Sequence, residues 1–237
     1  MKTIVIAMLL ALATGGLAQD GENITGITGA GVKLGVAWAS MNTNDDEFNA
    51  GSAGGLTGGA FLTYGLAPKL AIQPELLYVA KGSSEADLFG SSGFDCGYLE
   101  LPVLLKYNLY DKGRMKPGLY LGPAVSALLF ADLFSEGFIN DYSYDVKDGM
   151  KSFDASFVVG GEVEFGSSKQ VKFSIDVRYS LGLTNTVDPT KWNEGRKIVD
   201  EGDWGPFHWI DYDRPLLEDN VYAKNRVFSI MMGVRFM

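Results

Sequence analysis

The segment from residue 185 to 224 combines aromatic and acidic side chains in a way that suits recognition. It holds three of the four Trp residues and the single His of the chain, among several Asp and Glu residues. Rigid aromatic anchors dominate recognition surfaces, so this segment could bind a glycan, a cation or a protein partner. The alternative, that these side chains pack as a lid over the rest of the fold, stays open. The candidate binding surface consists of Trp192, Trp204, His208, Trp209 and Tyr212.

The same segment is the only place where metal binding or general-base catalysis is conceivable. The carboxylates of residues 200–213 are ligands that Ca²⁺ accepts, but their spacing departs from the EF-hand calcium loop. His208 is the only side chain with an ordinary pKa near neutrality, and the chain has neither a nucleophile elbow nor an HExxH motif. Cys96 is the single cysteine, which excludes an intramolecular disulfide and a cysteine-rich zinc site. We therefore predict no enzyme, no catalytic or metal site and no cofactor.

A second set of chemically active residues is spread along the chain, each placed between apolar neighbours. It contains six acidic and six basic side chains, and this balance is what a narrow, closed interior requires, because buried charges must be paired. We interpret the set as a lumen salt-bridge network, with a proton or ion path as the sharper alternative. Its members are Lys33, Glu75, Lys81, Glu100, Lys106, Asp154, Glu162, Glu164, Lys172, Asp176, Arg178 and Arg235.

Strands must position these charges, because apolar and polar residues alternate with a period of two. The clearest stretch is 171–184, which alternates over its whole length and is longer than an average globular strand. A tilted strand that crosses a bilayer needs about 9 to 11 residues. The pattern predicts eight strands, at 31–40, 54–64, 70–81, 97–107, 117–130, 153–165, 171–184 and 226–236.

The predicted connections alternate in length. Long ones at 41–53, 82–96, 131–152 and 185–224 alternate with short ones at 65–69, 108–116 and 166–170. This regularity predicts an all-β fold, an eight-stranded antiparallel up-and-down transmembrane β-barrel. Such a barrel is filled by its own side chains, so we do not expect an open diffusion pore.

The polar face decides which side of the barrel points inward. It is rich in Gly and balanced in charge, whereas the apolar face carries aromatic residues near strand ends, as the girdles of a membrane barrel do. We therefore expect the apolar face to contact lipid. A soluble, lipocalin-like barrel with the apolar face inside is the alternative.

The N-terminus indicates export. A charged start, an apolar run and small residues ending near Ala18 are typical of a cleaved signal peptide, and the run is short for a transmembrane anchor. The predicted organisation is a signal peptide at 1–18, a short periplasmic segment at 19–30 and the barrel domain at 31–237. The net charge of −9 argues against nucleic-acid binding.

Several motifs resemble the PorT-like family of small outer-membrane β-barrel proteins of Bacteroidetes. They are Gly31 to Val36, Gln73 to Tyr78, Tyr98 to Pro102, Asp176 to Asn185, and Asn225-Arg226 followed by Gly233 to Phe236. The resemblance spans most of residues 31–237 and implies an eight-stranded outer-membrane barrel, while the activity of the family is mostly undefined.

The sequence thus predicts a small outer-membrane protein with a structural or interaction role. We expect periplasmic termini and long extracellular loops that form the binding surface. The expected partners are outer-membrane lipid, the barrel-assembly machinery during biogenesis, and an envelope or secretion protein. The alternatives are a component of a secretion or envelope-assembly apparatus, as in the PorT-like family, and an outer-membrane hydrolase.

Overall fold

The structure is a computed structural model that describes residues 25–44, 51–87, 90–109, 114–137, 141–166, 170–193 and 220–237. The predicted signal peptide and residues 19–24 of the predicted periplasmic segment lie outside these residues. None of the helices in the described ranges is long and apolar enough to cross a membrane.

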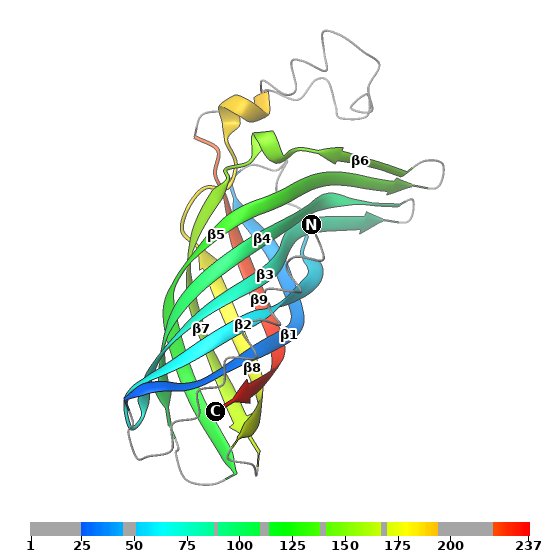
Figure 1. Cartoon of the computed structure of the whole chain (residues 1–237). Coiled ribbons are helices and arrows are strands. Elements are labelled where there is room, and N and C mark those ends of the chain that lie inside the picture. Colours follow the sequence, from blue (N-terminus) through cyan, green and yellow to red (C-terminus); the bar gives the residue numbers. More distant parts are fainter. Residues whose placement is uncertain are drawn as a thin grey trace.

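Of the nine strands in the described ranges, eight close into a barrel (Figure 1). Neighbours along the chain pair antiparallel, β4 also pairs with β5, and β9 returns to pair with β1. The remaining strand, β6, pairs with the end of β5 and with no other described strand. The predicted eight-stranded up-and-down barrel is therefore confirmed. The strands are β1 Gly26–Thr43, β2 Ala53–Ala67, β3 Leu70–Asp87, β4 Gly90–Asn108, β5 Met115–Gly137, β6 Asp141–Asp145, β7 Phe153–Phe165, β8 Val171–Gly182 and β9 Ala223–Phe236.

The strands are strongly tilted against the barrel axis. From Trp38 on β1, the register leads through Phe228 on β9 and Tyr179 on β8 around the wall, and it returns to β1 at Ile27. The path therefore comes back near the opposite end of the strand from which it started. Such a stagger is what closure of a small barrel requires.

The two faces of the wall have the polarity of a membrane protein. On β1, Leu34 is 67% exposed, whereas the adjacent Lys33 is 3% exposed. The same inversion recurs on β8, where Ile175 and Val177 face outward and Asp176 is fully buried. The prediction that the apolar face points to lipid is confirmed, and the lipocalin-like alternative is wrong.

Aromatic pairs lie on the outer face near both ends of the wall. Trp38 and Phe228 have ring centroids 5.9 Å apart near the end with long connections. Phe165 and Phe173 stack at 6.1 Å near the end with short turns. Aromatic side chains at these levels are typical of the two interfacial girdles of a membrane barrel.

Two of the predicted long loops are largely strand. Residues 82–87 and 90–96 continue the β3–β4 hairpin, and residues 131–137 and 141–145 belong to β5 and β6, so the loop predictions at 82–96 and 131–152 are wrong in these ranges. These segments lack an alternating pattern because neither face needs to be uniformly apolar outside the bilayer. We call residues 82–87, 90–96, 131–137 and β6 the protruding sheet; Figure 1 shows it leaving the barrel wall.

The remaining differences lie at strand ends. Strand β1 begins at Gly26, inside the segment predicted to precede the barrel. Strand β8 ends at Gly182, two residues before the predicted end. At the other side of the barrel the connections β2–β3, β4–β5 and β7–β8 are short, as predicted.

Candidate functional site

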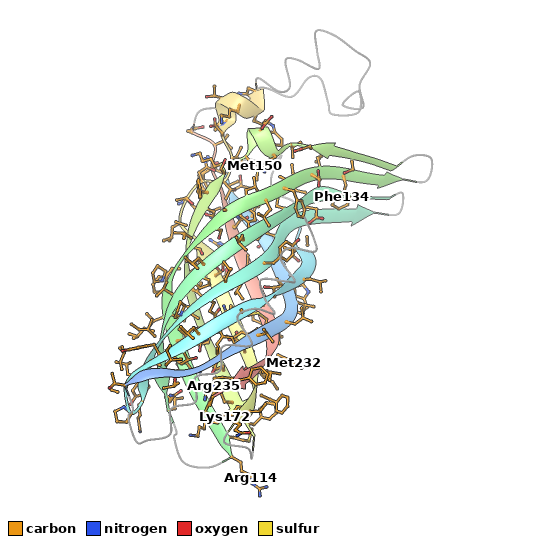
Figure 2. All side chains as sticks on the ribbon, in the orientation of Figure 1. Arg114, Phe134, Met150, Lys172, Met232 and Arg235 are labelled. Atoms are coloured by element: carbon orange, nitrogen blue, oxygen red, sulfur yellow. The ribbon has the colours of Figure 1, made fainter. Side chains whose placement is uncertain are left out.

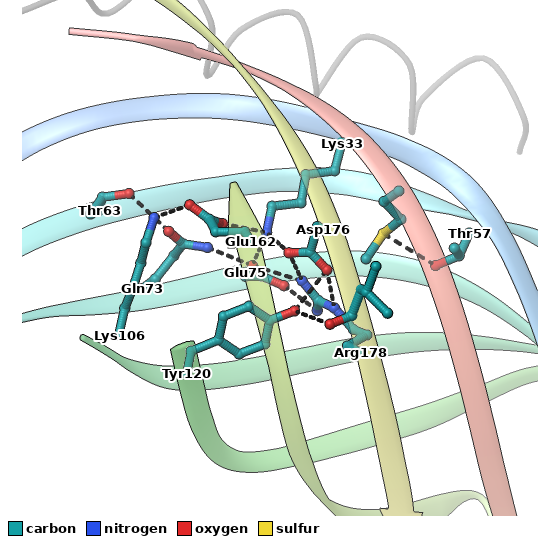
Figure 3. A network of polar contacts seen from close by, with 12 residues as sticks. Lys33, Thr57, Thr63, Gln73, Glu75, Lys106, Tyr120, Glu162, Asp176 and Arg178 are labelled. Carbon is teal, nitrogen blue, oxygen red and sulfur yellow. Dashed lines mark hydrogen bonds and ion pairs between the residues drawn. The ribbon is translucent and has the colours of Figure 1, made fainter. Parts of the chain in front are cut away.

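The lumen contains a buried charge network at its centre (Figure 3). Lys33 Nζ lies 2.8 Å from Glu75 Oε1 and 2.7 Å from Asp176 Oδ2. The Arg178 guanidinium binds the same two carboxylates, with Nη1 2.6 Å from Glu75 Oε2 and Nη2 2.9 Å from Asp176 Oδ2. The side chains of Lys33, Glu75 and Asp176 have no solvent exposure. These four charges therefore neutralise each other across the barrel.

Neutral groups complete this central network. The Tyr120 hydroxyl donates to Asp176 Oδ1 at 2.7 Å, and Gln73 Nε2 donates to Glu75 Oε1 at 2.8 Å. Gly160 leaves room for Tyr120, because a Cβ at this position would lie 2.5 Å from the Tyr120 hydroxyl oxygen. The remaining lone pairs of the buried carboxylates are thereby satisfied, as a buried network requires.

A second group of charges lies toward the end with short turns. Lys106 Nζ binds Glu162 Oε1 and also contacts Glu164 Oε1 at 3.1 Å. Arg235 Nη2 lies 2.9 Å from Glu164 Oε2. Glu162 Oε2 is 3.8 Å from Lys33 Nζ, which joins this group to the central network. Lys172, the twelfth predicted charge, makes no ion pair with any residue that the structure describes.

A third group lies toward the end with long connections. Lys81 Nζ is 2.9 Å from Glu100 Oε2 and 3.5 Å from Asp154 Oδ2. Ser126 donates to Glu100 Oε2 at 3.0 Å, and Asn225 donates to Asp154 Oδ2 at 3.0 Å. The structure thus connects eleven of the twelve predicted lumen charges by ion pairs.

A buried apolar cluster, which we call the plug, lies beyond the third group toward the end with long connections. It is built by β1, β4, β5 and the start of β9 and by the segments around residues 150, 187 and 221, with Leu133, Val146 and Trp192 packed against it. The two connecting segments join by the isolated bridge between Met150 and Val187. The buried members are Met41, Phe94, Cys96, Tyr98, Leu128, Ala131, Met150, Val187, Val221 and Ala223.

Trp192 is the one member of the predicted loop surface within the described residues. It lies in the short helix at 189–193, and its ring centroid is 5.8 Å from that of Phe94 in the plug. This side chain therefore packs inward over the barrel mouth, as the lid alternative expects. Trp204, His208, Trp209 and Tyr212 lie outside the described residues, and their binding role stays a prediction.

The protruding sheet carries a row of like charges. The register places Asp95 opposite Asp132, and Asp132 opposite Asp145, across three adjacent strands. Burial and the neighbouring Asp132 raise the pKa of Asp95 above its ordinary value. Charged side chains on the outer face place this sheet beyond the hydrocarbon region, because an unpaired carboxylate facing lipid is costly.

The structure adds residues that the sequence pattern did not reveal. Tyr120, Gln73 and Asn225 join the network as neutral side chains, and the plug assembles apolar residues from both strands and connections. Inward-facing Tyr120 and Gln73 could have been found from strand alternation. In the part of the chain that the structure describes, no group of three or more His, Cys, Asp and Glu side chains could hold a metal ion. The acidic residues 200–213, considered for Ca²⁺, lie outside that part.

The comparison with known proteins agrees with this architecture. A family model described as "Outer membrane protein beta-barrel domain" matches residues 18–188. No curated protein matches the chain. Among solved structures, Neisserial surface protein A is similar at 15% identity and a TM-score of 0.45, with 87% of this chain and 96% of that one covered. OprG from Pseudomonas aeruginosa has 14% identity and a TM-score of 0.44, with 90% and 98% covered. Ail, the attachment invasion locus protein of Yersinia pestis, has 12% identity and a TM-score of 0.39, with 90% and 99% covered.

Proposed function

Because this chain belongs to the outer membrane protein beta-barrel domain family, which implies the bacterial outer membrane, we propose that it is a closed barrel with a structural or interaction role. Two observations support the proposal: the buried ion pairs in the lumen and the apolar plug at the end with long connections. The ion-paired side chains fill the centre, and the plug covers the end with long connections. A barrel of this width has no room left for bulk diffusion.

The binding surface of the proposal is the end with long connections. There the protruding sheet extends from a rigid wall, and open sheet edges and connecting segments on a scaffold are common recognition sites. The predicted aromatic surface of Trp192, Trp204, His208, Trp209 and Tyr212 lies in the sequence between β8 and β9. We propose that this end is extracellular and that both termini are periplasmic, since β1 begins and β9 ends at the opposite end.

Cysteine labelling in intact cells tests both the orientation and the role. Because Cys96 is buried in the plug, we expect only the introduced cysteines to react with the label. Ser143→Cys on β6 is expected to react with a membrane-impermeant maleimide, whereas Arg114→Cys beside the short turn at the other end is expected to react only after cell lysis. The reverse pattern would contradict the orientation.

The same two positions then test for a partner. A photo-crosslinker at residue 143 is expected to yield adducts with an external partner, and the matched crosslinker at residue 114 is not. Adducts with secretion or envelope-assembly proteins would favour the narrower PorT-like role, which stays a prediction. Absence of adducts at both positions, with a normal barrel, would leave the purely structural role.

A further inference from the structure

The rim of the barrel at the end with short turns carries an excess of positive charge. On its lumen side, Lys106, Lys116, Lys172 and Arg235 face Glu162 and Glu164, which gives 4 − 2 = 2 surplus positive charges among the described residues. Figure 2 shows Lys172 and Arg235 at this end of the wall. This surplus contrasts with the central network, where two cations and two carboxylates balance.

The two carboxylates of the rim are already engaged. Lys106 binds both, and Arg235 binds Glu164. Lys116 and Lys172 make no ion pair with the described part of the chain. Arg235 and Lys116 are the charges that act most strongly on Lys172; Glu164 opposes them, and Lys106 adds a smaller repulsion. The rim therefore has more cations than its two carboxylates pair with among the described residues.

The strand register explains why the cations stay close together. Lys172 on β8 lies directly opposite Arg235 on β9, and Lys116 on β5 lies opposite Glu164 on β7. Like charges directly opposite each other destabilise a strand pair. An anion bound between Lys172 and Arg235 would contact both cations and offset their mutual repulsion. The register therefore favours anion binding.

Arg235 supplies an independent indication. Its Nη2 donates to Glu164, but its Nε is buried and has no hydrogen-bond partner among the described residues. A buried donor without an acceptor costs free energy. The planar guanidinium can donate two parallel hydrogen bonds to the oxygen atoms of a phosphate or carboxylate. The flexible ammonium groups of Lys116 and Lys172 add positive charge and can adapt to the position of the anion.

We propose that Lys116, Lys172 and Arg235, which we call the basic rim, bind a phosphate group. A phosphate group offers several acceptor oxygens to the guanidinium and the two ammonium groups, and inorganic phosphate also matches the surplus of two positive charges. Two sources of this group are reachable. The stacked pair Phe165 and Phe173 lies on the outer face at the same end, where aromatic side chains mark the headgroup level, so a phospholipid headgroup is one source. Free phosphate entering the mouth is the other.

The test compares phospholipid retention and phosphate binding in matched variants. The rim variant is Lys116→Gln with Lys172→Gln, and the control is Lys151→Gln with Lys224→Gln at the opposite end, which removes the same charge. Native mass spectrometry after extraction from bilayers of mixed phosphatidylglycerol and phosphatidylcholine measures the retained lipid. We expect wild type and control to retain phosphatidylglycerol preferentially, and the rim variant to lose the preference.

The second arm is a titration with inorganic phosphate at constant ionic strength, followed by the amide chemical shifts of residues 114–116, 118 and 170–174. Saturation there without a lipid preference assigns the site to free phosphate. A lipid preference without saturation assigns it to the headgroup. Neither response in wild type, or the same response in the rim variant, would overturn the proposal. If the rim variant does not fold, Lys172→Arg, which keeps the charge, must retain the wild-type response.

Discussion

At the residue scale, Asp176 has the strongest structural role in the central network. It accepts from Lys33, Arg178 and Tyr120, and its removal leaves two buried cations with one carboxylate. We expect Asp176→Asn to lower the free energy of unfolding by about 3–5 kcal/mol, because breaking a buried ion pair leaves uncompensated charge. Urea unfolding in lipid vesicles measures this. The exposed Asp148→Asn is the control, and equal losses in both variants would contradict the expectation.

The identity of the lumen residues could be predicted from the sequence, but their pairing could not. Alternation places Lys33, Glu75 and Asp176 on one face because each lies between apolar neighbours. Lys33 nevertheless pairs with residues 42 and 143 positions away, and these contacts depend on strand order and stagger. Neutral members such as Tyr120 carry no signal in a charge pattern.

At the element scale, the row of aspartates weakens the protruding sheet at neutral pH. The raised pKa of Asp95 means that the folded sheet binds its proton more tightly than the unfolded chain does. The stability of the sheet is therefore full below the unfolded pKa of Asp95 and falls as pH rises toward its folded pKa. Asp132→Asn should reduce this pH dependence, because the burial of Asp95 remains, and gain roughly 0.2–1 kcal/mol at neutral pH, the range for cross-strand charge pairs.

Hydrogen exchange of residues 93–97, expressed as protection factors, measures the change at neutral and mildly acidic pH. Ser143→Asn on the neighbouring β6 is the control, since it alters no charge. Greater protection of wild type at neutral than at acidic pH would contradict the expected direction of the pH dependence.

The strands of the protruding sheet could not be predicted from the sequence. Residues 82–96 are rich in Gly and Ser and lack alternation, although backbone pairing continues through residues 82–87 and 90–96.

At the scale of the whole molecule, the charge network and the plug close the lumen at different heights. The network depends on ion pairs, whereas the plug depends on apolar packing and on the Met150–Val187 bridge. Closure in series means that either barrier alone blocks a solute. The fold and the lipid-facing side could be predicted from alternation, but the plug could not, because it joins Phe94 and Trp192 from distant segments.

Conductance across planar bilayers distinguishes closure in series from closure by a single barrier. We expect Trp192→Ala, which loosens the plug, to conduct no more than wild type, because the central ion pairs still fill the barrel. Replacing Glu75 and Arg178 together by Ala removes a matched pair without leaving surplus charge, and the intact plug should keep this variant closed as well. Only the combination of all three substitutions should conduct.

Conductance through the Trp192→Ala variant would show that the charge network alone does not block the lumen. Conductance through the variant with Glu75 and Arg178 replaced would show that the plug alone does not block it. Faster gel migration of the unheated protein confirms that each variant still forms a closed barrel, so a conducting triple variant with this mobility reports an emptied lumen rather than an unfolded wall.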